Sequence, residues 1–407
     1  MTADTPLRLF ASLPDMVLAH ASITPNATAI IDGDRQVTFR ELKILLDRVA
    51  AGLQRDGLRP KQAIAICAQS SIEYLAVFLG ALKAGAVVTP LAPSSTADQL
   101  VMMLGDCAAS ALFLDAGVAA LLSPVTDQIT ARRIALDSSS TDIPFAQWLP
   151  PEGASPMKVE IKANWTFNII YASGPTGAPK SVVQSHAMRW AHIGRGAGHG
   201  YEGDAVTLVS TPLHSNTTLV SVIPALALGG TVVLMREFDA LEFLALAEKH
   251  RATHAMLVPA QYHRIMALPE FDHFDLSSFK MKFSTSAPFA AALKADVLKR
   301  WPGGLIEYCD ITEGDRSLSL AAQDHPDQLH AVGRPAAGHD IRLMDERGEE
   351  VRRGDIGKVG ARDRAGCASD QNDLTILRAC YAKLAIFGWD ELILPIWLNA
   401  PDLEEPS

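Results

Sequence analysis

The chain has 407 residues, 48% of them hydrophobic and 20% charged, and its formal net charge at pH 7 is -10. This length and composition are typical of a globular protein with enough buried core for two or three domains. No run of Lys or Arg exceeds two residues. Together with the negative net charge, this argues against a nucleic-acid partner, although the local field of a loop can still bind an anionic nucleotide.

The cysteines and the N-terminus indicate a cytoplasmic protein. The five cysteines are widely spaced, odd in number and without a CxxC pair, which disfavours a zinc site or a disulfide framework. The first residues, MTADTPLRLF, include an acidic side chain and lack the long apolar core of a secretory signal. No apolar run approaches the ~18 residues that a transmembrane helix needs.

The first predicted helix follows Thr38. Thr38 and Glu41 have the spacing of a capping box, in which each side chain binds the backbone N–H of the other residue. Apolar residues then recur at helical spacing, and Gly57 is placed to end the helix. These apolar positions are Leu42, Leu45, Leu46, Val49 and Leu53.

Strands and helices alternate along the rest of the chain. Short apolar runs predict strands at 63–67, 87–90, 111–114, 166–171, 205–210, 231–235, 254–258, 281–285 and 305–309. Periodic segments between them predict helices at 71–84, 96–106, 186–195, 217–228, 239–250, 259–267 and 289–300. Buried strands that alternate with helices indicate parallel sheets, so the fold class is α/β.

The predicted organisation is two parallel or mixed α/β subdomains followed by a small β-barrel-like unit. A polar stretch rich in Pro, Gly and Ser, residues 137–155, separates the subdomains at about 1–150 and 151–330. From Asp340 the period changes to that of a hairpin, which predicts a β unit over about 331–364. Residues 365–407 match nothing expected after such a unit.

The most informative segment is Tyr171–Lys180, YASGPTGAPK, which is rich in glycine and hydroxyl groups and ends in a cation. Glycines bring backbone N–H groups close to a bound anion, so this loop suits a triphosphate. It is not a P-loop, because Pro179 rather than Gly precedes Lys180 and only two residues separate Gly174 from Gly177. The alternative is an ordinary surface loop.

The segment resembles the phosphate loop of the AMP-forming adenylating enzymes, the superfamily of acyl-CoA synthetases, luciferases and peptide-synthetase adenylation domains. Pro175 and Ser181 depart from the pattern of that family. The matching residues are Ser173, Gly174, Thr176, Gly177, Pro179, Lys180, Val182 and His186.

Further segments resemble the same family in the same chain order, from about residue 20 to 360. They are Pro25, Ala27 and Ala29, Thr38-Phe39 with Glu41-Leu42, Glu73, Ala84–Ala86, Pro90–Pro93, Thr211–His214, Thr285–Pro288, Thr312-Glu313, and Val332–Pro335 with Gly338. The resemblance implies the fold of the large N-terminal domain of an adenylate-forming enzyme.

The resemblance also implies a reaction. A carboxylic acid would attack the α-phosphate of ATP to give an acyl-adenylate, and coenzyme A would then take the acyl group. Because both reactants are anions, catalysis would depend on positioning and on neutralising charge. Thr312 would bind the α-phosphate, and Glu313 would hold Mg²⁺, which prefers oxygen ligands. The implied phosphate-binding residues are Ser173, Gly174, Thr176, Gly177 and Lys180.

The remaining implied roles concern adenine and the acid. His214 would line the gate between acyl pocket and nucleotide, although a lone His is more often a structural buried residue. Cys309 and Asp310 take the place of the Tyr-Gly pair that lies by the adenine in the family. The turn along the adenine is Ser286, Ala287 and Pro288, acting through its backbone.

Two helix faces have plainer expectations. The apolar strip after His214 favours a hydrophobic acid, fatty or aromatic, but the same strip would also pack a core helix. Its residues are Leu219, Val220, Val222, Ile223 and Ala225. Lys294, Lys299 and Arg300 are expected to form a solvated helix face.

Departures from the family pattern predict impaired activity. Cys309 cannot stack on adenine as Tyr does, and Asp310 adds a negative charge where an anionic substrate would bind. Lys358 stands where the pattern has an acid. The Thr-Gly-Asp element and a lysine-bearing lid domain are not found, so the chain is expected to be truncated, and residues 365–407 to come from a shifted reading frame or a fused segment.

The leading hypothesis is an AMP-forming acyl-CoA synthetase, an acid–thiol ligase, impaired in this form. The alternative is a catalytically inactive remnant that binds nucleotide or a partner subunit. An oxygenase or a peptide-synthetase module is disfavoured, because no carrier-domain serine motif or second module is present. The sequence favours no particular oligomeric state.

Overall fold

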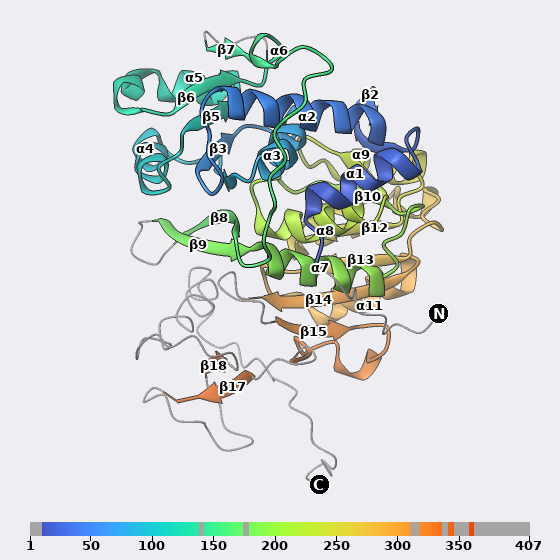
Figure 1. The fold of residues 1–407 in the computed structure, drawn as a ribbon. Helices are drawn as coiled ribbons and strands as arrows, with labels where there is room; N and C mark the ends of the chain where they lie inside the picture. The colour runs from blue at the N-terminus through green and yellow to red at the C-terminus, as the bar shows by residue number, and fades with distance from the viewer. Residues whose placement is uncertain are drawn as a thin grey trace. The chain divides into compact units, whose positions relative to one another are not determined.

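The computed structural model describes residues 10–137, 142–173, 179–310, 317–335, 341–345 and 358–361 (Figure 1). The chain forms two compact units. Unit 1 is Met1–Ser173 with Gly177–Met256, and unit 2 is Gly174–Thr176 with Leu257–Ser407. The tail predicted over 365–407 lies outside the described residues.

Unit 1 contains a seven-stranded sheet of order β7-β6-β5-β3-β4-β8-β9. Its neighbouring strands are parallel except for β8 and β9, which form an antiparallel hairpin. All five residues of β3 are buried, as expected of a central parallel strand. The strands are β3 (Ala63–Cys67), β4 (Val87–Pro90), β5 (Ala111–Leu114), β6 (Arg132–Ala135), β7 (Ile143–Pro144), β8 (Thr166–Ser173) and β9 (Pro179–Ser185).

The other strands of unit 1 follow the order β12-β10-β11-β1-β2. They are β1 (Thr28–Asp32), β2 (Arg35–Thr38), β10 (Val206–Val209), β11 (Thr231–Leu234) and β12 (His254–Leu257). The hairpin β1–β2 therefore joins strands that come after residue 205, whereas β8 and β9 join the earlier ones. The sheets do not follow the predicted division near residue 150, because sequence pattern identifies strands but not their partners.

The helices of unit 1 begin at side-chain caps in most cases. Thr38 Oγ1 accepts a hydrogen bond from the Glu41 backbone N–H at 3.3 Å, and Glu41 Oε2 accepts one from the Thr38 N–H at 2.7 Å. This confirms the predicted capping box. The helices are α1 (Leu13–Ile23), α2 (Phe39–Arg55), α3 (Ile72–Lys83), α4 (Ala97–Asp106), α5 (Ala116–Leu122), α6 (Phe145–Trp148), α7 (His186–Gly198), α8 (Asn216–Ala227) and α9 (Ala240–Lys249), with a 3₁₀ turn at Ser123–Gln128.

In unit 2, β13 (Met281–Ser284) and β14 (Gly304–Asp310) are parallel, and β14, β15 (Ser317–Ala321) and β16 (Arg334–Pro335) follow in antiparallel order. The helices are α10 (Pro259–Met266) and α11 (Ala291–Arg300), with 3₁₀ turns at Phe271–His273 and Pro326–Gln328. Across both units, no helix in the described residues is long and apolar enough to span a bilayer.

The predicted hairpin beyond Asp340 is a two-stranded antiparallel sheet of β17 (Ile341–Met344) and β18 (Lys358–Ala361). Ile341 pairs with Ala361 and Met344 with Lys358. The described strands form mixed open sheets and no closed barrel, so the β-barrel-like part of the expectation is wrong for the residues that are described. A barrel needs more strands than the alternation over these few residues can supply.

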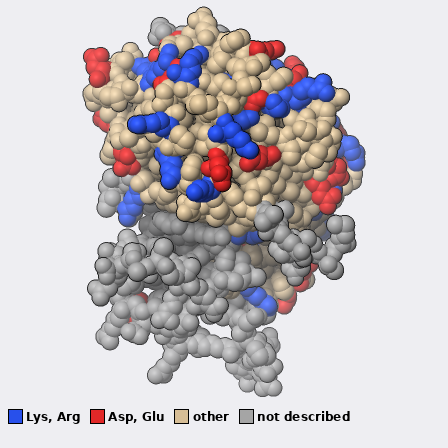
Figure 2. All heavy atoms as spheres, viewed as in Figure 1, with Lys and Arg blue, Asp and Glu red and all other residues tan. Residues whose placement is uncertain are grey.

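Charges of both signs are mixed on the described surface. On the face shown in Figure 2, basic and acidic side chains are intermingled over the described residues. Some are paired, as in Lys43 with Asp47 at 2.6 Å and Arg133 with Asp142 at 2.9 Å. A surface of mixed sign provides little of the long-range attraction that a polyanion needs.

Candidate active site

The phosphate-loop motif includes the connection between β8 and β9, at the turn end of this hairpin. Ser173 pairs with Pro179 and Ala172 with Lys180, so the chain leaves and re-enters the sheet around residues 174–178. Lys180 is exposed on β9. The hairpin thus holds Ser173 and Lys180 on adjacent strands, as an anion-binding loop requires, while Gly174, Thr176 and Gly177 lie outside the described residues.

Tyr171 fastens this hairpin to α4. Its hydroxyl lies 2.5 Å from Asp106 Oδ2 and 3.1 Å from the backbone oxygen of Met103. Burial, followed by the hydrogen bond to Asp106, raises the pKa of the Tyr171 phenol. The phenol therefore stays neutral and donates, which fixes the strand just before Ser173.

A buried arginine lies behind the hairpin. Arg189 on α7 is 1% exposed, and its Nη2 donates to Asn168 Oδ1 on β8 at 3.2 Å, to Gln184 Oε1 on β9, and to Asn216 Oδ1 at the start of α8 at 2.9 Å. Its Nη1 lies 3.3 Å from His192 Nδ1. Burial lowers the pKa of the guanidinium to about 9.

This hydrogen-bond network, which was not predicted from sequence, connects both strands of the β8–β9 hairpin (the phosphate hairpin) to the segment that carries His214. Arg189 remains charged at neutral pH, and its hydrogen-bond partners within the described residues are neutral side chains. The available signal was the placement of Asn168 and Gln184 at strand positions where apolar residues are usual.

His214 itself is half-buried just before α8. Burial lowers the pKa of its imidazole, so the neutral form is favoured. The neighbouring Leu213 N–H donates to Ser70 Oγ at 3.3 Å, which anchors this turn to the β3 side of unit 1. In contrast, His186 has the features of a structural residue: it is buried, its pKa is lowered to about 4 by burial, and its ring meets Phe167 edge-on at 5.0 Å.

The apolar strip after His214 packs as core. Leu219, Val222, Ile223 and Ala225 are each no more than 2% exposed, and only Val220 is half-buried. The strip therefore has little exposed surface with which to contact an acid.

Unit 2 carries the residues implied in adenine recognition. Ser286, Ala287 and Pro288 are exposed in the turn that follows β13. Ser286 has φ of 79°, in the left-handed region that favours glycine. Such strain is a common feature of binding turns, where backbone geometry rather than side chain makes the contact.

Cys309 and Asp310 lie at the end of β14, opposite Leu318 and Ser317 of β15. Tyr308 points to the other face of the strand, as the two-residue period requires, and its ring stacks on Phe283 with centroids 6.0 Å apart. Cys309 is half-buried. The Tyr308 ring thus packs against β13 and does not lie on the face of the strand that carries Cys309.

The remaining predicted ligands are not located. Thr312 and Glu313 lie outside the described residues, and within the described ones no group of three or more His, Cys, Asp or Glu side chains gathers as a metal site. The magnesium assignment to Glu313 therefore stays a prediction.

The solvated face expected on α11 is wrong for Lys294. Its side chain is 1% exposed and forms an ion pair with Glu307 of β14. Lys299 is exposed as expected, and Arg300 pairs with Asp272 at 3.0 Å and Asp296 at 3.2 Å. Helical spacing predicts all three on one charged face. The structure differs because Lys294 pairs with a buried acid, Glu307, on the neighbouring strand.

The chain is similar in sequence to a known family and to individual relatives. A sequence family described as AMP-binding enzyme matches residues 17–365. The chain is 27% identical over 375 residues to an indoleacetate–CoA ligase of Aromatoleum aromaticum, covering 89% of this chain and 72% of that protein. It is 28% identical over 348 residues to a feruloyl-CoA synthase of an Amycolatopsis species, covering 84% and 67%.

Solved structures share the fold. The anthranilate CoA ligase AuaEII in complex with anthranoyl-AMP has a TM-score of 0.80 at 22% identity, covering 89% of this chain and 72% of that one. The amide bond synthetase McbA of Marinactinospora thermotolerans has a TM-score of 0.78 at 24% identity, covering 86% and 70%. The N-terminal domain of FACL13 from Mycobacterium tuberculosis has a TM-score of 0.77 at 23% identity, covering 86% and 88%.

Proposed function

The chain belongs to the AMP-binding enzyme family, and we propose that it activates a carboxylic acid with ATP and passes the acyl group to coenzyme A. The acid oxygen bonds to the α-phosphorus while the bond to the leaving pyrophosphate breaks. The sulfur of coenzyme A then bonds to the acyl carbon, AMP leaves, and the thiol proton passes to solvent. The family match over most of the chain is the observation that carries this proposal.

The phosphate hairpin supplies the first contacts. Lys180 and the backbone around Ser173 neutralise charge on the β- and γ-phosphates at the turn end of the hairpin. Arg189 keeps the two strands aligned by bonding a side chain from each. Precise alignment matters because catalysis between two anions depends on positioning and fixed charge.

The proposed catalytic set also includes Thr176, Thr312, Glu313 and His214. Thr312 binds the α-phosphate, and Glu313 supplies a carboxylate oxygen suited to Mg²⁺. When bound, the ion neutralises phosphate charge. His214, neutral and half-buried, shapes the gate between acid and nucleotide.

We propose an aromatic acid as the substrate. The relatives are named for acids that carry aromatic rings, indoleacetate and ferulate. Location in the cytoplasm stays a prediction from the spacing of the cysteines. The domain division at residue 364 likewise stays a prediction.

Exchange of labelled pyrophosphate into ATP tests the proposal directly. The purified chain is incubated with ATP, magnesium and a panel of arylacetic, cinnamic and fatty acids. We expect acid-dependent exchange that is greatest with aromatic acids and falls at least about 10²-fold in Lys180→Met, as for loss of one transition-state donor. Lys299→Met, an exposed lysine of α11, is the matched control.

A second function is favoured by one observation. Cys309 and Asp310 stand at the end of β14 in place of the Tyr-Gly pair of the resembled family, and Tyr308 packs on Phe283 instead of replacing that ring. A chain that binds nucleotide without forming adenylate would fit this. Measurable ATP binding with no exchange for any acid in the panel would support it and reject the ligase.

A further inference from the structure

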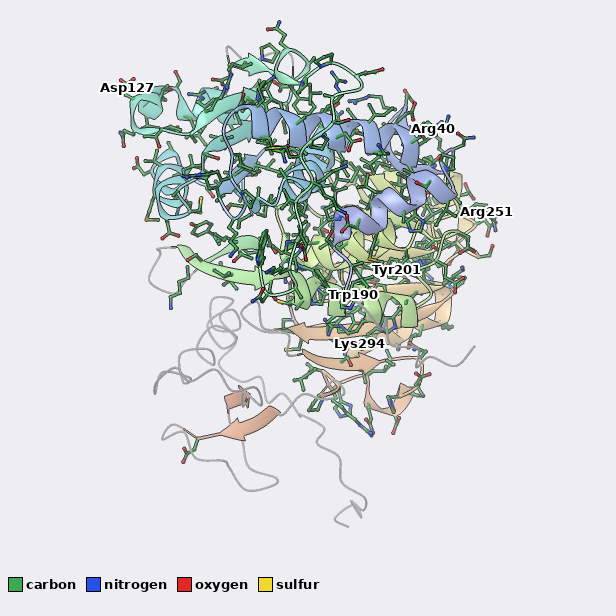
Figure 3. All side chains as sticks on the ribbon, viewed as in Figure 1. Arg40, Asp127, Trp190, Tyr201, Arg251 and Lys294 are labelled. Carbon is green, nitrogen blue, oxygen red and sulfur yellow. The ribbon has the colours of Figure 1, made fainter. Side chains whose placement is uncertain are left out.

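Two segments of unit 2 that the family resemblance places by the adenine, and the loop that leads into the Val332–Pro335 element, meet at one buried ion pair. Lys294 on α11 (labelled in Figure 3) and Glu307 on β14 form this pair, and their side chains are 1% and 4% exposed. Burial raises the pKa of the Glu307 carboxyl, while the neighbouring Lys294 opposes that shift. The Lys294 ammonium therefore favours the charged form of the buried Glu307 carboxyl.

The first segment is the turn that ends at Pro288. The Glu307 carboxylate accepts a hydrogen bond from the backbone N–H of Phe289, the residue directly after the turn. Lys294 Nζ also lies 5.9 Å from the centroid of the Phe289 ring. Both members of the pair thus contact Phe289, the residue that directly follows the turn.

The second segment is the end of β14. Glu307 and Cys309 are two residues apart, so they share one face of the strand. The third segment leads into the Val332–Pro335 element, since Lys294 Nζ donates to the backbone oxygen of Ala331 at 3.0 Å. One ammonium group therefore joins helix, strand and loop.

A hydrophobic pair could fill the same space at equal or greater stability, because two buried charges lose much of their hydration energy. An apolar pair could not make the three donor–acceptor contacts that fix the turn, the strand end and the loop. We propose that Lys294 and Glu307 are positioning residues that hold these three segments in register for adenine recognition, an inference that rests on the proposed function.

The test separates positioning from stability by a double-mutant cycle. Lys294→Met, Glu307→Gln and the double variant are compared with wild type for unfolding free energy, for ATP affinity and for preference of ATP over GTP. Lys299→Met on the same helix is the matched control, because its side chain is exposed. Binding is measured by calorimetry below the melting temperature of every variant.

We expect Lys294→Met to be the least stable, because it leaves an unpaired buried carboxylate, and the double variant to regain much of that loss. We expect ATP affinity to fall about tenfold, near 1.4 kcal/mol, in both single variants and in the double variant, together with the preference for ATP over GTP. The KM for the acid should stay within about twofold, since an acid contact is not involved.

Recovery of ATP affinity and preference in the double variant, in parallel with its stability, would overturn the inference and leave the pair a structural feature. Unchanged affinity and preference in the single variants would overturn it as well. If wild type itself binds no ATP while remaining folded, the proposed function fails first and the inference falls with it. The two failures are thus distinguished by the wild-type measurement.

Discussion

At the scale of single residues, Arg189 shows how much a buried cation can organise. It contacts β8, β9 and the start of α8 through amide oxygens of Asn168, Gln184 and Asn216. We expect Arg189→Met to lower the unfolding free energy by about 3 kcal/mol, because several buried amides lose their partner. Arg189→Lys should recover little, since an ammonium cannot reach all three acceptors.

Urea unfolding of the variants measures this loss of unfolding free energy. The control is Arg40→Met, at an exposed position (Figure 3). Pyrophosphate exchange in the same variants should fall along with stability of the hairpin. A change within about 0.5 kcal/mol, the range of ordinary surface substitutions, would show that the network contributes nothing to the fold.

Lys282 gives a prediction about pH. Its Nζ donates to the backbone oxygens of Trp301, Pro302 and Gly303 at 3.1, 2.6 and 2.8 Å, and burial lowers its pKa to about 7. The unfolded lysine titrates near its ordinary value of about 10.4, so between these values the unfolded chain binds more protons. The contribution of Lys282 to stability should therefore rise with pH from about 7 to 10.

Urea unfolding at pH 7 and pH 9 checks this sign. The difference between wild type and Lys282→Met isolates the lysine from other titrating groups, and wild type should gain stability over the variant as pH rises. A gain on lowering the pH instead would mean that the three carbonyl oxygens hold the ammonium form more strongly than burial opposes it.

At the scale of elements, Gly333 makes the approach of β16 to β15 possible. Its φ is 100°, and a Cβ there would lie 1.9 Å from the backbone oxygen of Ser319. Gly333→Ala should lower the unfolding free energy by about 3 kcal/mol, from overpacking and left-handed strain combined. Gly105→Ala, with open space around it in α4, should instead be neutral or gain up to about 1 kcal/mol.

Thermal and urea unfolding of the two variants side by side measure this contrast. Equal effects at both positions would mean that β15 and β16 separate without cost.

Most elements could be predicted from sequence, and the exceptions have identifiable causes. Apolar runs located β3, β5 and β11 to within a residue, because buried parallel strands are continuous in character. The β1–β2 hairpin and β9 were missed, since their residues were assigned to family motifs instead of tested for alternation. Cap chemistry was predictable at Thr38, because both partners of its capping box lie within three residues.

The candidate site was predicted less completely than the fold. Short motifs predict Ser173, Lys180 and His214 as site residues, because each stands in a local sequence pattern. Lys294 and Arg189 depend on partners that are distant in the chain, Glu307 and Asn216, and helical spacing carries no information about those. Tertiary context therefore decided which polar residues are buried.

At the scale of the whole molecule, nucleotide binding should be visible as stability. A ligand that binds only the folded state at about 100 times its Kd adds about 2.7 kcal/mol to the unfolding free energy. We expect magnesium and ATP to raise the melting temperature and EDTA to remove most of the rise. An identical rise in Lys180→Met would contradict the role given to the phosphate hairpin.

The pairing of Ile30 in β1 with Val232 in β11 has a consequence for biogenesis. At about 5–20 residues per second, a ribosome needs about 10–40 s to synthesise the chain between these partners. Throughout that interval β1 and β2 are on the nascent chain with an open edge, and nascent strands with open edges are sites of aggregation and of chaperone capture. The β1–β2 hairpin therefore pairs with the rest of its sheet only late in synthesis. The yield of folded protein in cells should depend on how well the open edge of β1 is protected until then.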